Sequence, residues 1–300
     1  MAQPVGRGLE WGREARFGAT IEMVTHMPQL TDTDRPLPHY EDPPLDEVAI
    51  GVQFEPLAKF SAAHLGAYWL RIRSRYPTVE DNPPMPHRKE ASEIGPVQPE
   101  NIIRIGGIAA PRCWFIAEDG SQLIQFQRDQ FFRNWRRHKG AETYPRYPAL
   151  REAFGHDWDE FQGFVREEGL GEIQINQCEL TYVNQIPKGS GWETFSDLTR
   201  VFTFLRPMRG NLVADPEIVE WGSKYKLPDG RGRVHIELSP AFRARDFAMV
   251  MTLTLRARGA PSGSGRKDLL AWYDFAREWV VRAFDELTTS EMHSTWKKRS

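Results

Sequence analysis

The sequence predicts an α+β fold in which antiparallel sheets are covered by helices, and three observations indicate it. Apolar and polar residues alternate along several short segments, most clearly over 247–258, as they do on strands with one buried face. A tight turn at 118–120 joins two such segments as a hairpin. A long segment at 267–292 repeats apolar residues every three to four positions, which is typical of an amphipathic helix lying across a sheet.

The first hundred residues are expected to contain a leader, a strand, a helix and a loop. Residues 1–44 are rich in Pro, Gly, Asp and Thr, and we expect an extended leader because proline restricts the backbone. Structure is expected to begin at Leu45 with a strand that ends near residue 57. A helix over about 57–75 follows, and a polar, Pro-rich loop is expected over 78–100.

The middle of the chain is expected to form the hairpin, a second helix and a long strand. The hairpin strands are 111–117 and 121–130, the helix covers about 147–168, and the strand covers 172–187. Side chains on this strand alternate between two faces. One face carries Leu180, Tyr182, Asn184 and Ile186, and the other carries Glu179, Thr181 and Val183.

The last third is expected to contain three strands, at 201–207, 232–240 and 244–259, before the long C-terminal helix. We therefore divide the chain into the leader, an N-terminal α+β half at 45–187 and a C-terminal α+β half at 188–300. The halves share no obvious sequence repeat. Their relation is a topological hypothesis in which each follows a β-α-β-β plan.

Composition excludes several classes of partner and location. The formal net charge of −2 provides no bulk field that would attract nucleic acid or an acidic membrane. Two cysteines, Cys113 and Cys178, favour a reducing compartment, and both are expected to be buried and unreactive. The N-terminal residues lack a signal-peptide pattern, and no window has the length and apolarity of a membrane span. We therefore expect a cytoplasmic protein.

Motifs for catalysis and metal binding are missing from the sequence. The eight histidines are dispersed and form none of the patterns HxH, HxxxH or HExxH. The glycine-rich runs at 189–192 and 263–268 lack the spacing of a phosphate-binding loop, and no nucleophile elbow GxSxG is present. We predict no catalytic residue, no metal site and no cofactor, and the sequence favours a protein that is not an enzyme.

Two clusters are candidates for binding. Residues Arg133–His138 place cationic side chains around Trp135, which suits stacking on a base and neutralising phosphate, or contact with an acidic protein surface. The structural alternative is the end of an element with solvated arginines and a buried tryptophan. The second cluster, Glu179, Thr181, Tyr182 and Asn184, would suit acid–base work if the sheet lined a cavity. Its structural alternative is the solvated side of a sheet.

Several segments together resemble a sporadically distributed family of uncharacterised prokaryotic proteins of about this length. They are PLDEVAIGVQFEPL, LIQFQRDQFFRNWRR and ELTYVNQIP, in this order, with the long C-terminal helix. The resemblance implies no activity, but the patchy occurrence of such proteins suggests defence or toxin–antitoxin loci. With the arginine that precedes Asn134, the matching positions give the predicted partner- or ligand-binding residues: Gln125, Gln127, Arg128, Arg133, Asn134, Trp135, Arg136, Glu179, Tyr182 and Asn184.

Three functional hypotheses follow. The first is a non-enzymatic accessory protein that contacts a protein partner encoded nearby, in a bacterial defence or toxin–antitoxin system. The alternative is a small-ligand-binding protein or enzyme with a cavity between a sheet and the long helix. A cavity containing Glu179 or Tyr182 would favour this alternative, and a filled core would count against it. The second alternative is nucleic-acid binding through Arg133–His138.

Overall fold

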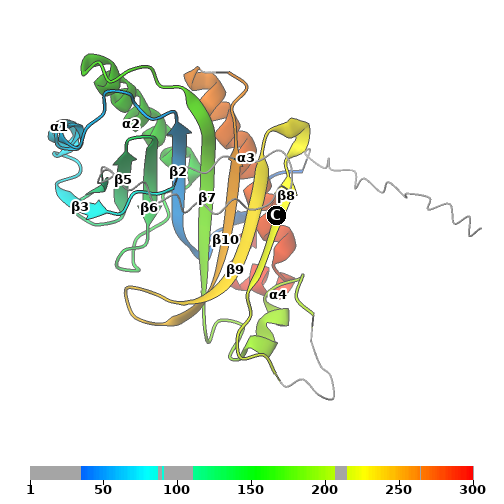
Figure 1. Ribbon diagram of the computed structural model, residues 1–300. Helices are drawn as coiled ribbons and strands as arrows, with labels where there is room; N and C mark the ends of the chain where they lie inside the picture. Colours follow the sequence, from blue (N-terminus) through cyan, green and yellow to red (C-terminus); the bar gives the residue numbers. More distant parts are fainter. Residues whose placement is uncertain (1–34, 87–89, 91–110, 207–214, 264, 300) are drawn as a thin grey trace, which may run out of the picture. The chain divides into compact units, whose positions relative to one another are not determined.

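The computed structural model describes residues 35–86, 90, 111–206, 215–263 and 265–299. Most strands belong to one antiparallel sheet of nine, in the order β3-β4-β5-β6-β2-β7-β10-β9-β8 (Figure 1). Their bounds, in that order, are Thr78–Asn82, Arg112–Ile116, Gln122–Gln127, Gln130–Arg136, Leu45–Phe54, Ile175–Pro187, Met249–Gly259, Arg233–Phe242 and Trp221–Lys226. A two-stranded ribbon pairs β1 (His39–Tyr40) with β11 (Lys298–Arg299).

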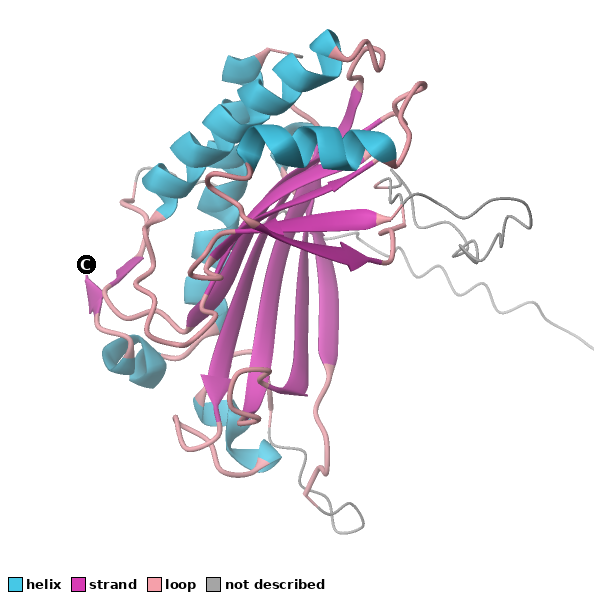
Figure 2. Ribbon diagram, turned by 90° about the vertical axis from the view of Figure 1, so that its left-hand side faces the viewer, coloured by secondary structure: helices cyan, strands magenta, loops and turns pink. Residues whose placement is uncertain are grey.

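The longer helices lie on one side of the nine-stranded sheet (Figure 2). They are α1 (Ala63–Ile72), α2 (Tyr147–Glu167) and α3 (Arg266–Leu287), and the short α4 (Ser290–Thr295) follows α3. Helix α3 contacts β7 and β10, and α2 contacts β6 and α3. Because strand side chains alternate between faces, the helix-covered face receives the apolar residues of each central strand.

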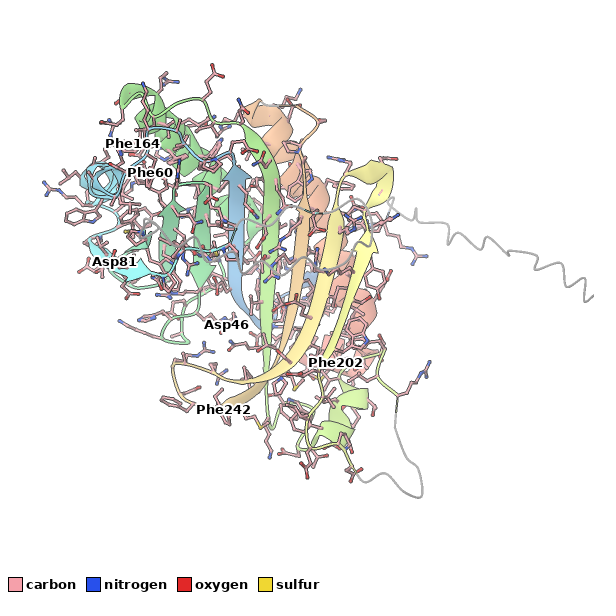
Figure 3. The ribbon with its side chains drawn as sticks, in the orientation of Figure 1. Asp46, Phe60, Asp81, Phe164, Phe202 and Phe242 are labelled. Carbon is pink, nitrogen blue, oxygen red and sulfur yellow. The ribbon has the colours of Figure 1, made fainter. Side chains whose placement is uncertain are left out.

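Aromatic rings fill the space under α1 and α2. Tyr68 of α1 contacts Phe126, Phe131, Phe161 and Phe164, with ring centroids 5.2–6.3 Å apart. The rings of Phe131 and Phe161 stack at 4.6 Å. All five side chains are fully buried, and each large ring contributes about 1.5–3 kcal/mol through burial alone. Figure 3 shows Phe164 beside α1 at this end of the sheet.

The predicted fold class is confirmed. The strands are antiparallel, helices cover the sheet, and the C-terminal helix packs on it. The boundary proposed at Pro187 falls at the end of β7, and strands from both sides of it join the same sheet.

One strand was wrongly placed. Residues 201–206, predicted as strand, form turns with a single bridge from Phe202 to Thr288. The adjacent apolar residues Val201 and Phe202 are both buried, and Phe202 forms its bridge beside the end of α3, so their apolar character reflects packing there and not pairing in the sheet. The remainder of the predicted segment lies outside the described residues.

Five strands were missed: β1, β3, β6, β8 and β11. β3 lies within the predicted loop 78–100 and β1 within the predicted leader, and β6 follows the predicted hairpin strand that ends at residue 130. β3 and β8 are the two edges of the large sheet, where only one neighbour is available and side chains stay mostly exposed. Edge strands therefore lack the buried alternation that identifies a strand in sequence.

Candidate ligand-binding site

A cavity of about 280 Å³ lies between the sheet and the C-terminal half of α3. This volume lies just below the usual range for ligand pockets, ~300–1,000 Å³, so the cavity suits a small ligand. Strands β2, β7 and β10 supply its floor, α3 supplies one wall, and the segments 38–43 and 144–148 supply the other. The lining residues are Pro38, His39, Tyr40, Pro43, Leu45, Tyr144, Arg146, Tyr147, Pro148, Tyr182, Asn184, Leu255, Arg277, Val281 and Phe284.

The floor follows from the register of the central strands. Alternation along β7 directs Tyr182 and Asn184 to the helix-covered face. Leu255 of β10 is paired with Tyr182, and Leu45 of β2 is paired with Asn184, so the four side chains form one patch. The amide nitrogen of Asn184 donates to the carbonyl oxygen of Leu253 at 3.2 Å, which fixes the orientation of the side chain.

The wall from α3 is a helical stripe. Arg277, Val281 and Phe284 are spaced by four and three positions, so they project from the same side of the helix. Val281 and Phe284 are apolar, whereas Arg277 brings a guanidinium group into an otherwise apolar stripe. Its guanidinium lies over the ring of Tyr147, 4.8 Å from the ring centroid.

Two tyrosine hydroxyls meet in the cavity. The oxygens of Tyr144 and Tyr182 lie 3.4 Å apart. Burial raises the pKa of both hydroxyls, and for Tyr182 the neighbouring Tyr144 raises the pKa further. Both therefore stay protonated at neutral pH and act as hydrogen-bond donors, so neither is a general base.

Arg146 holds the outer wall in place. Its guanidinium donates to the carbonyl oxygens of Tyr40 at 2.7 Å and Glu41 at 3.1 Å, and it lies 5.5 Å from the ring centroid of Tyr144. The backbone of Arg146 has φ +70°, a conformation that costs a residue with a side chain on the order of 1–3 kcal/mol. Pairing of β1 with β11 also holds His39 and Tyr40 in place. A strained backbone conformation persists only where contacts with the surrounding structure hold it, and such conformations are enriched at ligand sites.

Of the predicted site residues, only Tyr182 and Asn184 line this cavity. Glu179 lies on the opposite face of the sheet, where it accepts hydrogen bonds from Arg258 Nε at 2.7 Å and Thr181 Oγ1 at 2.9 Å. Arg256 Nε lies 3.2 Å from the same carboxylate. Glu179 is thus neutralised by two guanidinium groups.

The predicted glutamines also lie on the opposite face or at its edge. Gln125 donates to Asn134 at 2.9 Å, and Gln127 exchanges hydrogen bonds of 2.9 Å with the backbone of Met85. Arg128 donates to the carbonyl oxygen of Leu57 at 3.4 Å. These side chains hold adjacent segments of the protein together.

The Arg133–His138 cluster does not form a single surface, because its first four residues belong to β6 and alternate between faces. Trp135 is only 2% exposed and packs against Tyr144, with ring centroids 5.2 Å apart. Arg133 is 7% exposed and pairs with Asp157, so the expectation of solvated arginines is wrong for this residue. Arg136 donates to the carbonyl oxygen of Gly120 at 3.0 Å. No ring at Trp135 is available for base stacking.

A second polar network lies on the face of the sheet opposite the helices. Glu90 pairs with His235, and its carboxylate lies 3.6 Å from Arg233 and 3.9 Å from Arg258. Burial alone would raise the pKa of Glu90, but the hydrogen bond with His235 and the nearby positive charges outweigh it and lower the pKa. This carboxylate is therefore ionised and fully paired.

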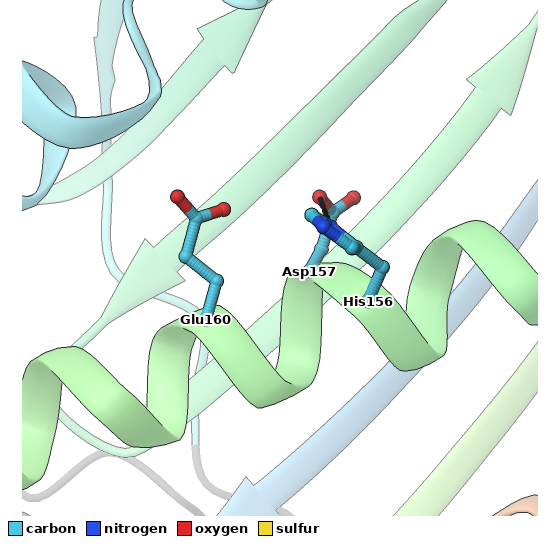
Figure 4. A group of neighbouring side chains, drawn as sticks. All are labelled: His156, Asp157 and Glu160. Carbon is cyan, nitrogen blue, oxygen red and sulfur yellow. Dashed lines mark ion pairs between the residues drawn. The ribbon is translucent and has the colours of Figure 1, made fainter.

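Three side chains of α2 approach the geometry of a metal site. Potential ligand atoms of His156, Asp157 and Glu160 lie within 4.8 Å of one another (Figure 4). Asp157, however, pairs with Arg133 at 2.8 Å and with Arg75, and Glu160 also pairs with Arg75. Two guanidinium groups already neutralise these carboxylates, so the arrangement is an ion-pair network between elements.

Sequence reasoning missed Tyr144, Arg146 and Arg277. Arg277 could have been identified from the sequence, because it is a charged residue at a helical spacing otherwise occupied by Tyr273, Val280 and Phe284. Arg146 could not have been identified from the sequence, since its positive φ and its hydrogen bond to the Tyr40 carbonyl oxygen depend on tertiary structure.

Comparison with protein-family models, with curated proteins and with solved structures finds no match to this chain. The resemblance described above therefore stays a prediction. None of the helices in the described ranges is long and apolar enough to cross a membrane. Conclusions about function rest on the geometry of the molecule.

Proposed function

We propose that the protein binds a small, largely apolar ligand in the cavity between the sheet and α3. The observation that carries the proposal is the unfilled space of about 280 Å³ beside Tyr182, where the long helix crosses the sheet. The space is open to the surface on one side, so a ligand can enter it, and concave sites of this kind are where small molecules bind.

The lining supports the same conclusion. Leu45, Leu255, Val281 and Phe284 provide apolar surface, and a few polar groups converge among them. That combination is characteristic of small-molecule sites, where apolar walls give affinity and a few polar groups give orientation. The strained backbone of Arg146 in the outer wall is a second feature common at such sites.

Binding, without a chemical step, is the activity that these groups support. Among the described residues that line the cavity there is no carboxylate and no cysteine, and the two tyrosine hydroxyls are held protonated. His39 is the lining residue that could act as a base, but it is exposed, and no hydrogen bond joins it to a nucleophile among the described residues. The expected protein partner in a defence system stays a prediction, with no observation among these residues in its favour.

Filling the cavity tests the proposal. Val281→Trp places a large ring in the lining, and Ala271→Trp adds the same ring at an exposed position of the same helix as a matched control. We expect one or more of a panel of neutral amides (benzamide, 3-phenylpropanamide, octanamide and 1-naphthylacetamide) to raise the melting temperature of the wild type and of A271W but not of V281W. A ligand at about 100 times its Kd stabilises by about 2.7 kcal/mol, which a thermal scan resolves.

The contrary outcome is equally clear. If the amides and the corresponding carboxylates all left the wild-type melting temperature unchanged, or if they stabilised V281W as much as the wild type, the cavity would not be a binding site.

A further inference from the structure

We infer that the ligand of this cavity is a hydrophobic monocarboxylic acid, whose carboxylate pairs with Arg277. The inference rests on the proposed function and identifies the class of ligand. It comes from an imbalance of charge in the lining: two arginines face the cavity, Arg146 and Arg277, and the lining residues include no acid.

Arg277 differs from the other arginines of α3 in its contacts. Arg266 pairs with Asp159 at 2.8 Å, and Arg282 pairs with Glu278 at 3.0 Å. Within the part of the chain that the structure describes, Arg277 has no carboxylate within 4 Å, and its buried Nε has no hydrogen-bond partner. The half-buried guanidinium is held over the Tyr147 ring, but its buried Nε–H has lost water without gaining an acceptor, and this costs free energy.

The nearest acidic residues on α3 are occupied elsewhere. Asp274 accepts hydrogen bonds from Tyr147 at 2.9 Å and from Arg151 at 2.8 Å. Asp285 accepts from Tyr40 and pairs with Lys298. Neither carboxylate is therefore available to neutralise Arg277, and the cavity keeps a positive charge.

The second arginine has acceptors within the protein. Arg146 donates two of its five N–H groups to the carbonyl oxygens of Tyr40 and Glu41, which orient its guanidinium toward the backbone of the outer wall. We therefore assign the anion-binding role to Arg277, which has no such acceptor among the described residues. Arg277 lines the same cavity as Tyr144 and Tyr182, whose hydroxyl oxygens lie 3.4 Å apart, so all three donors face one space.

These donors fit one carboxylate better than a phosphate or a cation. A carboxylate accepts charge-assisted hydrogen bonds from a guanidinium and has capacity left for a tyrosine hydroxyl. A phosphate dianion beside a single guanidinium would keep one negative charge unbalanced in a largely apolar pocket, and an ammonium group would be repelled. The remaining lining, Leu45, Leu255, Val281 and Phe284, suits an apolar body.

The test compares matched pairs of ligands that differ only in charge. Benzoate, 3-phenylpropionate, octanoate and 1-naphthylacetate are titrated beside their amides by calorimetry at pH 7.5. We expect the wild type to bind its best acid about tenfold or more tightly than the matching amide, as is typical of a charge-assisted pair. Arg277→Met should abolish this preference, so that the acid binds no more tightly than its amide.

Two further variants keep the result interpretable. Arg277→Lys retains the charge and should retain part of the preference, even if Arg277→Met folds poorly. Arg266→Met removes an exposed arginine of the same helix and should behave as the wild type. If the wild type bound each amide as tightly as the matching acid, the carboxylate assignment would be overturned, but the cavity would still be a binding site. If neither class bound at all, the proposed function would fail as well.

Discussion

Asp157 shows how single polar residues connect the elements of this fold. Its side chain is 1% exposed and accepts hydrogen bonds from Arg133 of β6 at 2.8 Å and from the Tyr76 hydroxyl at 3.2 Å. Arg75 also pairs with it. The carboxylate therefore joins α2 to the sheet and to the segment that follows α1. Burial of such a group is tolerated only because its partners satisfy it.

Removing one partner is expected to be costly. Arg133→Met leaves Asp157 with less compensation in a buried site, and we expect the free energy of unfolding to fall by about 3 kcal/mol. Arg151→Met removes an exposed ion pair with Asp274 and should cost less than about 1 kcal/mol. Urea unfolding followed by far-UV circular dichroism measures both. Equal midpoints for R133M and the wild type would contradict the structural role of Arg133.

At the scale of elements, the sequence predicted those whose apolar periodicity is strong. Helices α2 and α3 and strands β7 and β10 have a buried face along their whole length, and this face produces the pattern. Strand β6 was missed, in part because Arg133 occupies a position on the helix-covered face, where an alternating strand pattern requires an apolar residue. A tertiary partner, Asp157, makes the charge acceptable there, and no local signal reveals it.

The candidate site divides in the same way. Alternation along β7 was enough to separate Tyr182 and Asn184 from Glu179. The cavity lies on one face because of how α3 and the segment 38–43 pack on the sheet. The spacing of residues within β7 carries no information about this packing. Residues contributed by distant segments, such as Tyr144 and Arg146, were therefore missed.

Central strand β2 contains a close contact that constrains its sequence. Gly51 is paired with Phe132 of β6, and a Cβ at Gly51 would lie 2.0 Å from an atom of the Phe132 ring. Gly51→Ala should therefore displace this buried ring and lower the free energy of unfolding by about 1–3 kcal/mol.

A double variant checks the cause. Phe132→Leu replaces the ring with a smaller side chain, so the cost of Gly51→Ala should be smaller in the Phe132→Leu background than in the wild type. Urea unfolding of the four proteins gives the coupling energy. Strictly additive costs would show that the contact with the ring is not what excludes a side chain at position 51.

At the scale of the whole molecule, the two faces of the sheet are stabilised in different ways. One face buries apolar side chains under helices, and the other carries the charged network around Glu179 and Glu90. The first contribution depends little on pH. The second depends on the ionisation of Glu90.

The network around Glu90 should make the free energy of unfolding sensitive to acid. Since folding lowers the pKa of Glu90 below its ordinary value of 4.5, this residue stabilises the folded state above that pH, and the contribution is lost as pH falls through the folded pKa. Glu90→Gln should therefore be less stable than the wild type at pH 7, and the difference should shrink below pH 4.5. Urea unfolding across this range measures it. A difference independent of pH would contradict the assigned ionisation.

The open order of the sheet also affects how copies of the protein meet. The β3 edge carries Glu80 and Asp81, and the β8 edge carries Lys224 and Lys226, all on strands that are largely exposed. Two copies approaching through the same edge bring like charges together, which opposes pairing of their free backbone groups. The charged residues therefore oppose self-association through identical edges, and they leave unlike edges electrostatically attracted to each other.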